Sequence, residues 1–161
     1  NVAAHRRRAS KEVLSLVLTS DANRRLTTLD RELVEQRLRA YWGLRGNGET
    51  ESIASFLAED CSYCGTTWVG RMVPIRREGR EGCMGFARHL RSIVEHLETT
   101  LLDLVIDGEQ AAASRILKLR ARGTGRIGEV MVCSYVRFRD GLMAEIVELT
   151  DDISLTRLLR D

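Results

Sequence analysis

The chain has 161 residues, of which 43% are hydrophobic and 30% are charged, and its formal net charge is +2. This balance is typical of one globular domain whose core is large enough to fold without disulfides or metal, and it excludes a disordered chain. The near-neutral charge indicates no strongly acidic or basic partner, and no apolar run reaches the ~20 residues of a membrane span. We therefore expect a cytoplasmic protein that binds neither nucleic acid nor membranes.

Residues 1–23 are predicted to be an appendage, which includes a short helix, ahead of a domain that spans residues 24–161. The appendage carries the basic run His5-Arg6-Arg7-Arg8. No aromatic residues that could stack on bases are interleaved with these arginines. A solvated terminus is therefore favoured over a nucleic-acid-binding segment.

The first half of the domain is predicted to be mostly helical. Apolar residues at helical spacing form one stripe along residues 29–45, and Gly46-Asn47-Gly48 ends that helix. Two further helices are expected over residues 51–58 and 83–96. The remaining segments are a strand over 61–68 and, over 69–82, a loop or irregular edge strand that contains the only proline.

Residues 99–151 are predicted to form strands, because β-branched and apolar residues alternate there. The strongest signal is a hairpin over residues 128–152 with a turn at Arg139-Asp140-Gly141. In its second arm Glu148 shares a face with Leu142, Ala144 and Ile146, so a carboxylate interrupts an apolar row. The other expected elements are strands over 99–106 and 111–122 and a last helical turn over 154–160.

Early helices followed by successive strands are typical of an α+β domain, in which about three helices cover one face of a curved antiparallel sheet. The opposite face of the final strands is more apolar than an exposed sheet face should be. We therefore expect a homodimer formed sheet to sheet. The residues placed on that outer face are Met131, Cys133, Tyr135, Met143, Val147 and Leu149.

Three segments resemble the SnoaL-like branch of the nuclear transport factor 2-like superfamily. They are Phe56-Leu57-Ala58-Glu59-Asp60-Cys61-Ser62-Tyr63, Asp107-Gly108, and Val136-Arg137-Phe138-Arg139-Asp140-Gly141 leading to Glu148 and Asp151-Asp152. The resemblance covers roughly residues 27–152 and implies a cone-shaped fold around a central pocket. Its members include ketosteroid isomerases, polyketide cyclases, limonene-type epoxide hydrolases and binding domains without chemistry. Because one fold hosts all of these, the site residues must choose among them.

Arg115 is the only charged residue on the core-facing row of its strand. A guanidinium in such a row needs an anion, so we expect Glu148 to face it. In one interpretation Glu148 is a general base, and Arg115 orients it or stabilises developing negative charge. In the other the two residues form a structural ion pair, and both interpretations remain open.

The strand that contains Arg115 resembles the strand of limonene-type epoxide hydrolases that activates water. By this resemblance Arg115 matches the hydrolase Arg, Tyr63 matches a water-positioning Tyr, and Glu148 stands where the last-strand Asp lies. Leu117 replaces the first Asp, however, and Gly65 replaces the water-holding Asn. The intact hydrolase mechanism is therefore not expected.

Ketosteroid isomerases have acids at two positions where this chain has Gly65 and Ser134, so their mechanism is not expected either. An apolar pocket with polar tips is still predicted, as in many small-molecule sites. For Trp42 the helical stripe favours a core role. The residues predicted to line the pocket are Trp42, Trp68, Leu117 and Ser134.

We predict no metal site and no cofactor. Cys61 and Cys64 have CxxC spacing, but alternation along a strand points them to opposite faces, and free thiols are expected. His89 and His96 are seven residues apart on the third predicted helix, whereas metal ligands on one helix usually lie three or four apart. The GxGxxG letters at residues 123–128 precede a strand instead of a helix.

Two functions from different classes remain. The first is a cofactor-independent isomerase, cyclase or hydrolase that acts on a small apolar cyclic molecule, with Glu148, Arg115 and Tyr63 as its catalytic residues. The second is a non-catalytic ligand-binding or dimerisation module of the same fold. The missing acids at Leu117, Gly65 and Ser134 favour the second function, and the pair of Arg115 and Glu148 fits either.

Overall fold

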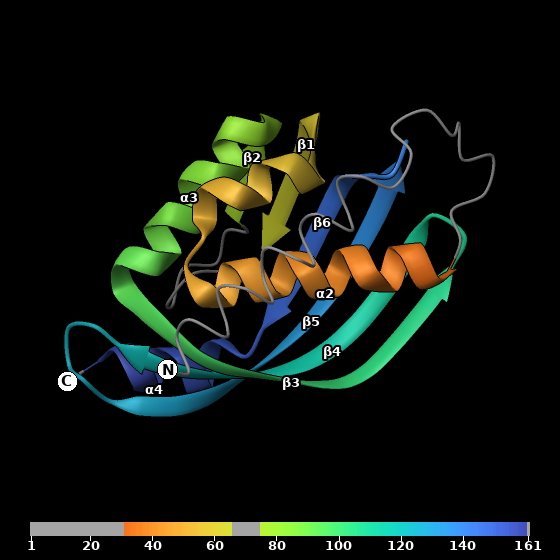
Figure 1. The fold of residues 1–161 in the computed structure, drawn as a ribbon. Coiled ribbons are helices and arrows are strands. Elements are labelled where there is room, and N and C mark those ends of the chain that lie inside the picture. Colours follow the sequence, from red (N-terminus) through yellow and green to blue (C-terminus); the bar gives the residue numbers. More distant parts are fainter. Residues whose placement is uncertain (1–30, 66–74, 161) are drawn as a thin grey trace, which may run out of the picture.

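The computed structural model describes residues 31–65 and 75–160, and it shows a curved six-stranded sheet with helices packed against it (Figure 1). The predicted α+β class is therefore confirmed. In chain order the elements are α2 (Arg31–Asn47), the 3-10 helix η1 (Thr50–Phe56), β1 (Leu57–Gly65), β2 (Ile75–Glu78), α3 (Gly79–Ile93), β3 (Val94–Asp107), β4 (Gln110–Ala121), β5 (Ile127–Arg139), β6 (Leu142–Thr150) and α4 (Asp152–Leu159).

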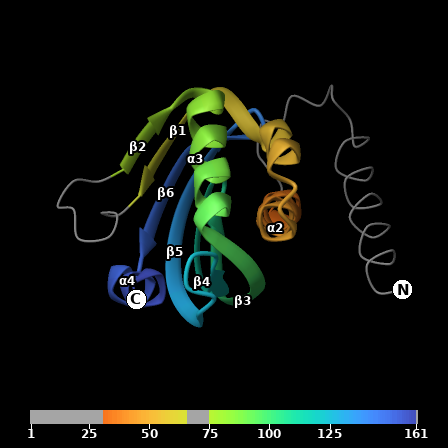
Figure 2. The same cartoon turned by 90° about the vertical axis from the view of Figure 1, so that its left-hand side faces the viewer.

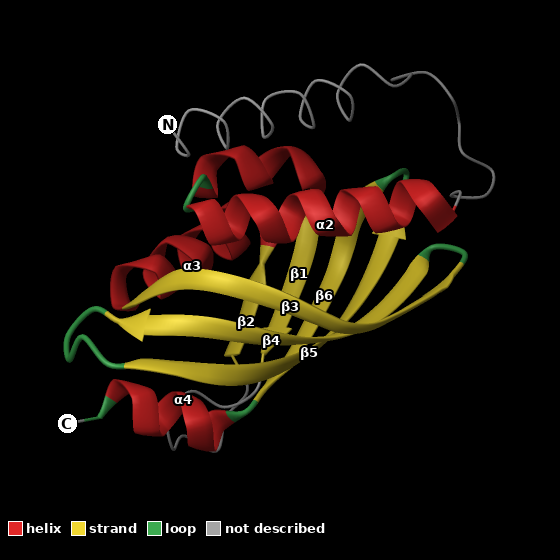
Figure 3. Cartoon of the chain, turned by 60° about the horizontal axis from the view of Figure 1, so that its bottom comes forward, coloured by secondary structure: helices red, strands yellow, loops and turns green. Residues whose placement is uncertain are grey.

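The sheet is mixed, with the strand order β2-β1-β6-β5-β4-β3 (Figure 3). Its neighbouring strands are antiparallel except for β1 and β6, which pair in parallel. The prediction of a wholly antiparallel sheet is wrong at this pair. Strands joined by a tight turn must run in opposite directions, but β1 and β6 are far apart in the sequence, so no turn sets their relative direction.

Several element boundaries differ from the prediction. The second predicted helix is a 3-10 helix, and β1 begins at Leu57, earlier than expected. The segment predicted as a loop or irregular edge strand over 69–82 contains β2, which is an edge strand of the sheet, and the start of α3, which begins at Gly79 with a positive φ of 72°. The third helix ends at Ile93, so His96 lies on β3 and not on a helix. Apolar residues around Ile93 fit either period, which is why spacing alone misplaced this boundary.

The predicted hairpin is present as β5 and β6, with positive φ at both turn residues, Asp140 and Gly141. One feature was not predicted: Arg137 pairs with Glu145, but Phe138 pairs with Met143, so β6 has one extra residue here. Because of this one-residue β-bulge, strict alternation does not hold across it, and a residue on one side of the bulge points to the opposite face from the one that alternation from the other side predicts. Met143 was predicted on the outer face and is instead fully buried, at 0% exposure.

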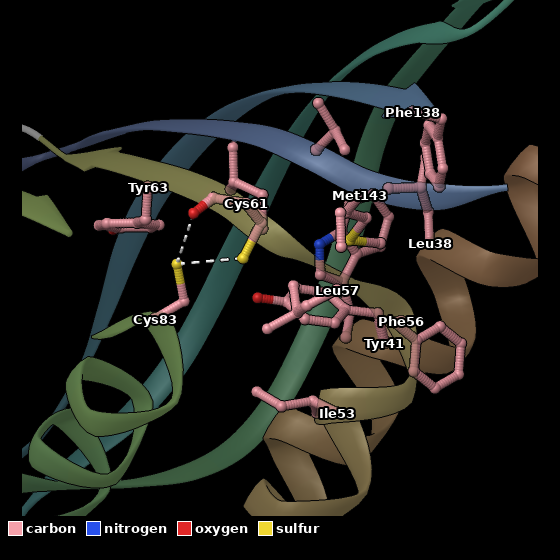
Figure 4. Packing of buried hydrophobic residues seen from close by; sticks show 14 of the residues in the cluster. Leu38, Tyr41, Ile53, Phe56, Leu57, Cys61, Tyr63, Cys83, Phe138 and Met143 are labelled. Carbon is pink, nitrogen blue, oxygen red and sulfur yellow. Dashed lines mark hydrogen bonds between the residues drawn. The ribbon is translucent and has the colours of Figure 1, made fainter. Parts of the chain in front are cut away.

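The core lies between the concave face of the sheet and the helices. Figure 2 shows α2 and α3 on the same side of the sheet. The predicted stripe of α2 is confirmed, since Val34, Leu38, Tyr41 and Trp42 are buried. Their packing partners from other elements include Phe56, Leu57, Phe138 and Met143 (Figure 4).

A second, smaller cluster covers the other end of the same face. There α4 packs Leu155 and Leu158 against Leu119, Val130 and Val132. The side chain of Asp151 caps α4, because it accepts hydrogen bonds from the backbone N–H groups of residues 153 and 154. The concave face is therefore covered at both ends, and the space between the two clusters is the place for a cavity.

The four cysteines are free, and two of them lie together in the core. Cys61 of β1 and Cys83 of α3 have their Sγ atoms 3.5 Å apart (Figure 4). Cys64 is half-buried and does not share this contact. Cys61 therefore meets a cysteine of α3 and not Cys64, the residue at CxxC spacing that was expected on the opposite face of the strand.

Candidate functional site

A cavity of about 830 Å³ lies between the helices and the concave face of the sheet, which is within the usual size range of small-molecule sites. Its wall is mixed and slightly more apolar than polar, and one end contains buried charge. The apolar lining includes Trp42, Phe86, Leu90, Leu101, Leu117, Val130 and Val132, and the polar lining includes Arg45, Tyr63, His96, Arg115 and Glu148.

The predicted contact between Arg115 and Glu148 is confirmed. Arg115 Nη2 donates to Glu148 Oε1 at 2.9 Å and to Ser134 Oγ at 2.6 Å, and the Ser134 hydroxyl lies 3.2 Å from the same carboxylate oxygen. Arg115 is 3% exposed and Glu148 is 5% exposed. These residues come together because β4, β5 and β6 are neighbours, and each residue occupies an inward position on its strand.

A second guanidinium completes the cluster. Arg45, in the last turn of α2, places Nη1 3.3 Å from both carboxylate oxygens of Glu148. The sequence analysis missed Arg45, although a signal was present. It lies four residues after Tyr41 and three after Trp42, and residues at these spacings share a face of a helix. The buried stripe therefore continues to Arg45.

Aromatic side chains fix the position of the charged groups. The guanidinium of Arg115 lies over the ring of Trp42, 4.2 Å from its centroid, which is a favourable cation–π contact. Tyr63 donates its hydroxyl to Glu148 Oε2 at 3.2 Å, and its ring packs against Phe86 at 4.8 Å between centroids. Trp42 thus belongs to both the core and the cavity wall, whereas Trp68 lies outside the described residues.

The charges of the cluster determine its protonation. Burial alone would raise the pKa of the Glu148 carboxyl, but the positive charges and hydrogen bonds of Arg45 and Arg115 outweigh it and hold that pKa at about 2. Burial, followed by the nearby carboxylate, raises the pKa of the Tyr63 hydroxyl. At neutral pH the cluster therefore contains an ionised carboxylate and a neutral phenol.

His96 is a cavity residue that the sequence analysis did not place there. Its Nε2 lies 2.7 Å from Thr99 Oγ1, and its ring approaches Gly46 so closely that a Cβ there would lie 2.8 Å from Nδ1. Burial and the positive charges of Arg45 and Arg115 lower the pKa of His96, so the imidazole is neutral at pH 7. The sequence analysis missed His96 because it extended the third helix to residue 96, whereas His96 lies on β3.

Within residues 31–65 and 75–160, no group of three or more His, Cys, Asp or Glu side chains is arranged to hold a metal ion. Among the same residues, no helix is long and apolar enough to cross a membrane.

A family model described as the SnoaL-like domain matches residues 38–146, which include every residue of the buried cluster except Glu148. The chain belongs to this family. The match ends two residues before Glu148. The family assignment therefore does not include this residue, and the role of its carboxylate is argued from its contacts alone. No curated protein matches this SnoaL-like domain in sequence.

Solved structures agree with the family. TsrD from Streptomyces laurentii is 27% identical, with a TM-score of 0.65 and coverage of 81% of this chain and 97% of that one. An LEH-like epoxide hydrolase from M. tuberculosis is 17% identical, with a TM-score of 0.63 and coverage of 80% and 90%. A Catenulispora acidiphila protein with a ketosteroid isomerase-like fold, in complex with trimethylamine, is 14% identical, with a TM-score of 0.67 and coverage of 81% and 94%. These similarities support the cone fold.

Proposed function

We propose that this SnoaL-like domain is a cofactor-independent enzyme of the isomerase, cyclase or hydrolase kind that acts on a small apolar cyclic molecule. The observation that supports this most is the combination of an apolar cavity with a buried cluster of two guanidiniums, a carboxylate and two hydroxyls at one end. A structural neighbour named as an epoxide hydrolase is consistent with such chemistry on this fold.

In this proposal Arg45 and Arg115 stabilise negative charge on a substrate oxygen, such as the oxygen of a carbonyl that becomes an enolate or of an epoxide that opens. Both guanidiniums are held in place before substrate arrives, so little reorganisation opposes the reaction. A unit charge about 4 Å from a guanidinium gains about 4 kcal/mol at an effective dielectric constant of about 20. That is enough to contribute substantially to catalysis.

The role of Glu148 follows from its low pKa. A general base works best when its pKa lies near the working pH. With a pKa of about 2, the Glu148 carboxylate is a weak proton acceptor. Its contacts therefore favour a role in which Glu148 holds the two guanidiniums in position, and not the role of general base. His96, which is neutral and lines the same cavity, is better suited to accept a proton.

The test is turnover of a panel of cyclic ketones and epoxides. We expect the wild type to convert at least one substrate, and we expect Arg115→Met to lower kcat/KM by about 100-fold or more, as the loss of an oxyanion-stabilising donor does. Glu145→Gln, which changes an exposed ion pair away from the cavity, is the matched control and should leave kcat/KM unchanged. No turnover on the panel, or turnover that survives Arg115→Met, would count against the proposal.

The alternative is a ligand-binding or dimerisation module without catalysis. It is favoured by Leu117, Gly65 and Ser134, which supply no carboxylate at the positions where the resemblance to enzymes of this fold expects one. In that case the cluster of Arg45, Arg115 and Glu148 would bind a ligand or stabilise the fold. Saturable ligand binding with no conversion of the bound molecule would support this alternative.

The sheet-to-sheet homodimer also remains a proposal. Met131 and Leu149 project from the outer face of β5 and β6 and are 44% and 58% exposed. Exposed apolar side chains of this kind are typical of an association surface. Light scattering at micromolar concentration should give twice the mass of the chain for the wild type, whereas Leu149→Glu should shift the mass towards the monomer. A monomeric wild type would contradict the proposal.

A further inference from the structure

The polar end of the cavity has an excess of positive charge. Arg45 and Arg115 share a single buried carboxylate, that of Glu148. Tyr63 does not supply a second anion, since the pKa of its hydroxyl is raised by burial.

The charged residues nearer the rim do not change this balance. They comprise equal numbers of bases and acids, so the excess comes from the buried cluster. The rim residues that line the cavity are Arg39, Arg91, Arg122, Glu95, Glu98 and Asp152.

Both guanidiniums retain donors that the described residues do not use. Arg115 bonds through Nη2, while its Nε is buried and has no hydrogen-bond partner among the described residues. Arg45 bonds to Glu148 through Nη1 at 3.3 Å, which is long for a charged pair, and within the described part of the chain its Nε and Nη2 have no partner. The side chain of Arg45 is 21% exposed, so it can reach a molecule in the cavity.

The rest of the cavity wall favours a ligand with a large apolar part. Phe86, Leu90, Leu101 and Leu117 line the cavity, and α4 adds Leu155. A ligand that fits both parts has an apolar ring system at one end and a negative charge at the other, because an anion pairs with the excess charge and a neutral group does not.

We propose that the cavity selects an organic anion, with its carboxylate bound by Arg45 and its apolar ring system packed against the leucine-rich wall. The inference rests on the proposed ligand pocket and names the class of molecule that it takes. It does not require catalysis. The planar guanidinium of Arg45 matches a carboxylate in a two-point contact, and Glu148 holds the guanidinium in position for it.

The experiment compares two probes of the same shape by calorimetry near pH 7: 2-naphthoate, which is ionised, and 2-naphthamide, which is neutral. We expect the wild type to bind 2-naphthoate at least about tenfold more tightly, a difference in affinity that calorimetry resolves easily. Arg45→Gln should remove most of this preference and leave the affinity for 2-naphthamide nearly unchanged. Arg137→Gln removes the same charge from the exposed side of the sheet and is the matched control.

Equal binding of the two probes by the wild type overturns the inference, as does a preference that survives Arg45→Gln. Absence of binding of either probe up to about 1 mM also overturns it. Circular dichroism of Arg45→Gln establishes that the variant is folded, and Arg45→Lys, which keeps the charge, should retain part of the preference. Anion-selective binding without turnover of any substrate would refute only the proposed enzyme, whereas turnover without anion preference would refute only this inference.

Discussion

The stability of the protein should depend on the ionisation of Glu148. The carboxyl has a pKa of about 2 in the folded chain, against an ordinary value of 4.5. Because the folded pKa is depressed, the stabilisation is fully present above the ordinary pKa and is lost as the pH falls towards 2. Each pKa unit corresponds to about 1.4 kcal/mol, so the contribution is about 3 kcal/mol at pH 7 and about 1 kcal/mol at pH 3.

Glu148→Gln is the matching perturbation. The amide keeps the shape of the side chain but leaves Arg45 and Arg115 without a counter-charge, which costs about 3 to 5 kcal/mol when a buried pair is broken. The partial exposure of Arg45 places the expected loss at the lower end of that range, about 3 kcal/mol at pH 7. At acid pH the wild-type carboxyl becomes protonated, so the two proteins should become more alike.

The assay is urea unfolding of the wild type and Glu148→Gln at several pH values between 7 and 3. We expect the difference in free energy of unfolding to shrink to about one third across this range. Glu145→Gln changes an exposed carboxylate on the same strand and should alter stability by no more than about 0.5 kcal/mol. A Glu148→Gln variant as stable as the wild type at pH 7, or a difference that does not change with pH, would refute the electrostatic reasoning.

Two further predictions concern the fold around the cavity. Met143→Ala removes a fully buried side chain beside the β6 bulge and should lower the free energy of unfolding by about 2 to 5 kcal/mol. Met131→Ala, at a 44% exposed position, should lower it by less than about 1 kcal/mol. Similar losses for the two variants in urea unfolding would argue against the bulge. Asp151→Ala removes the cap of α4 and should cost about 1 kcal/mol, seen as a lower Tm, and an unchanged Tm would show that the cap contributes nothing.

Much of the buried site was predictable, because it follows from side-chain alternation. The inward direction of Arg115, Ser134 and Glu148 is set by a period of two along each strand, so their meeting required only that the three strands be neighbours. The turn at Asp140-Gly141 makes β5 and β6 neighbours, since an Asp-Gly pair adopts the positive φ angles that a tight hairpin needs. Local chemistry of this kind can be read without the fold.

Arg45, His96 and Met143 were not placed correctly, and each failure has a physical cause. Arg45 shares the buried face of α2, but a charged residue in the last turn of a helix is usually exposed, and its partner comes from a strand 103 residues later. His96 depends on the residue at which α3 gives way to β3. Met143 depends on a bulge, which a single inserted residue creates and which a strict alternation of faces cannot predict.

The sequence by itself determined the α+β class, the helical stripe, the hairpin and the expectation that a buried arginine needs a buried carboxylate. Only the tertiary structure decided that β1 pairs in parallel with β6, that Arg45 joins Arg115 on the single carboxylate of Glu148, and that Cys61 meets Cys83. The reason is that periodicity along a chain specifies the direction in which each side chain points. Which other side chain each one contacts depends on how distant segments of the chain pack together. Those contacts determine which charged groups gather in the site, and therefore its net charge.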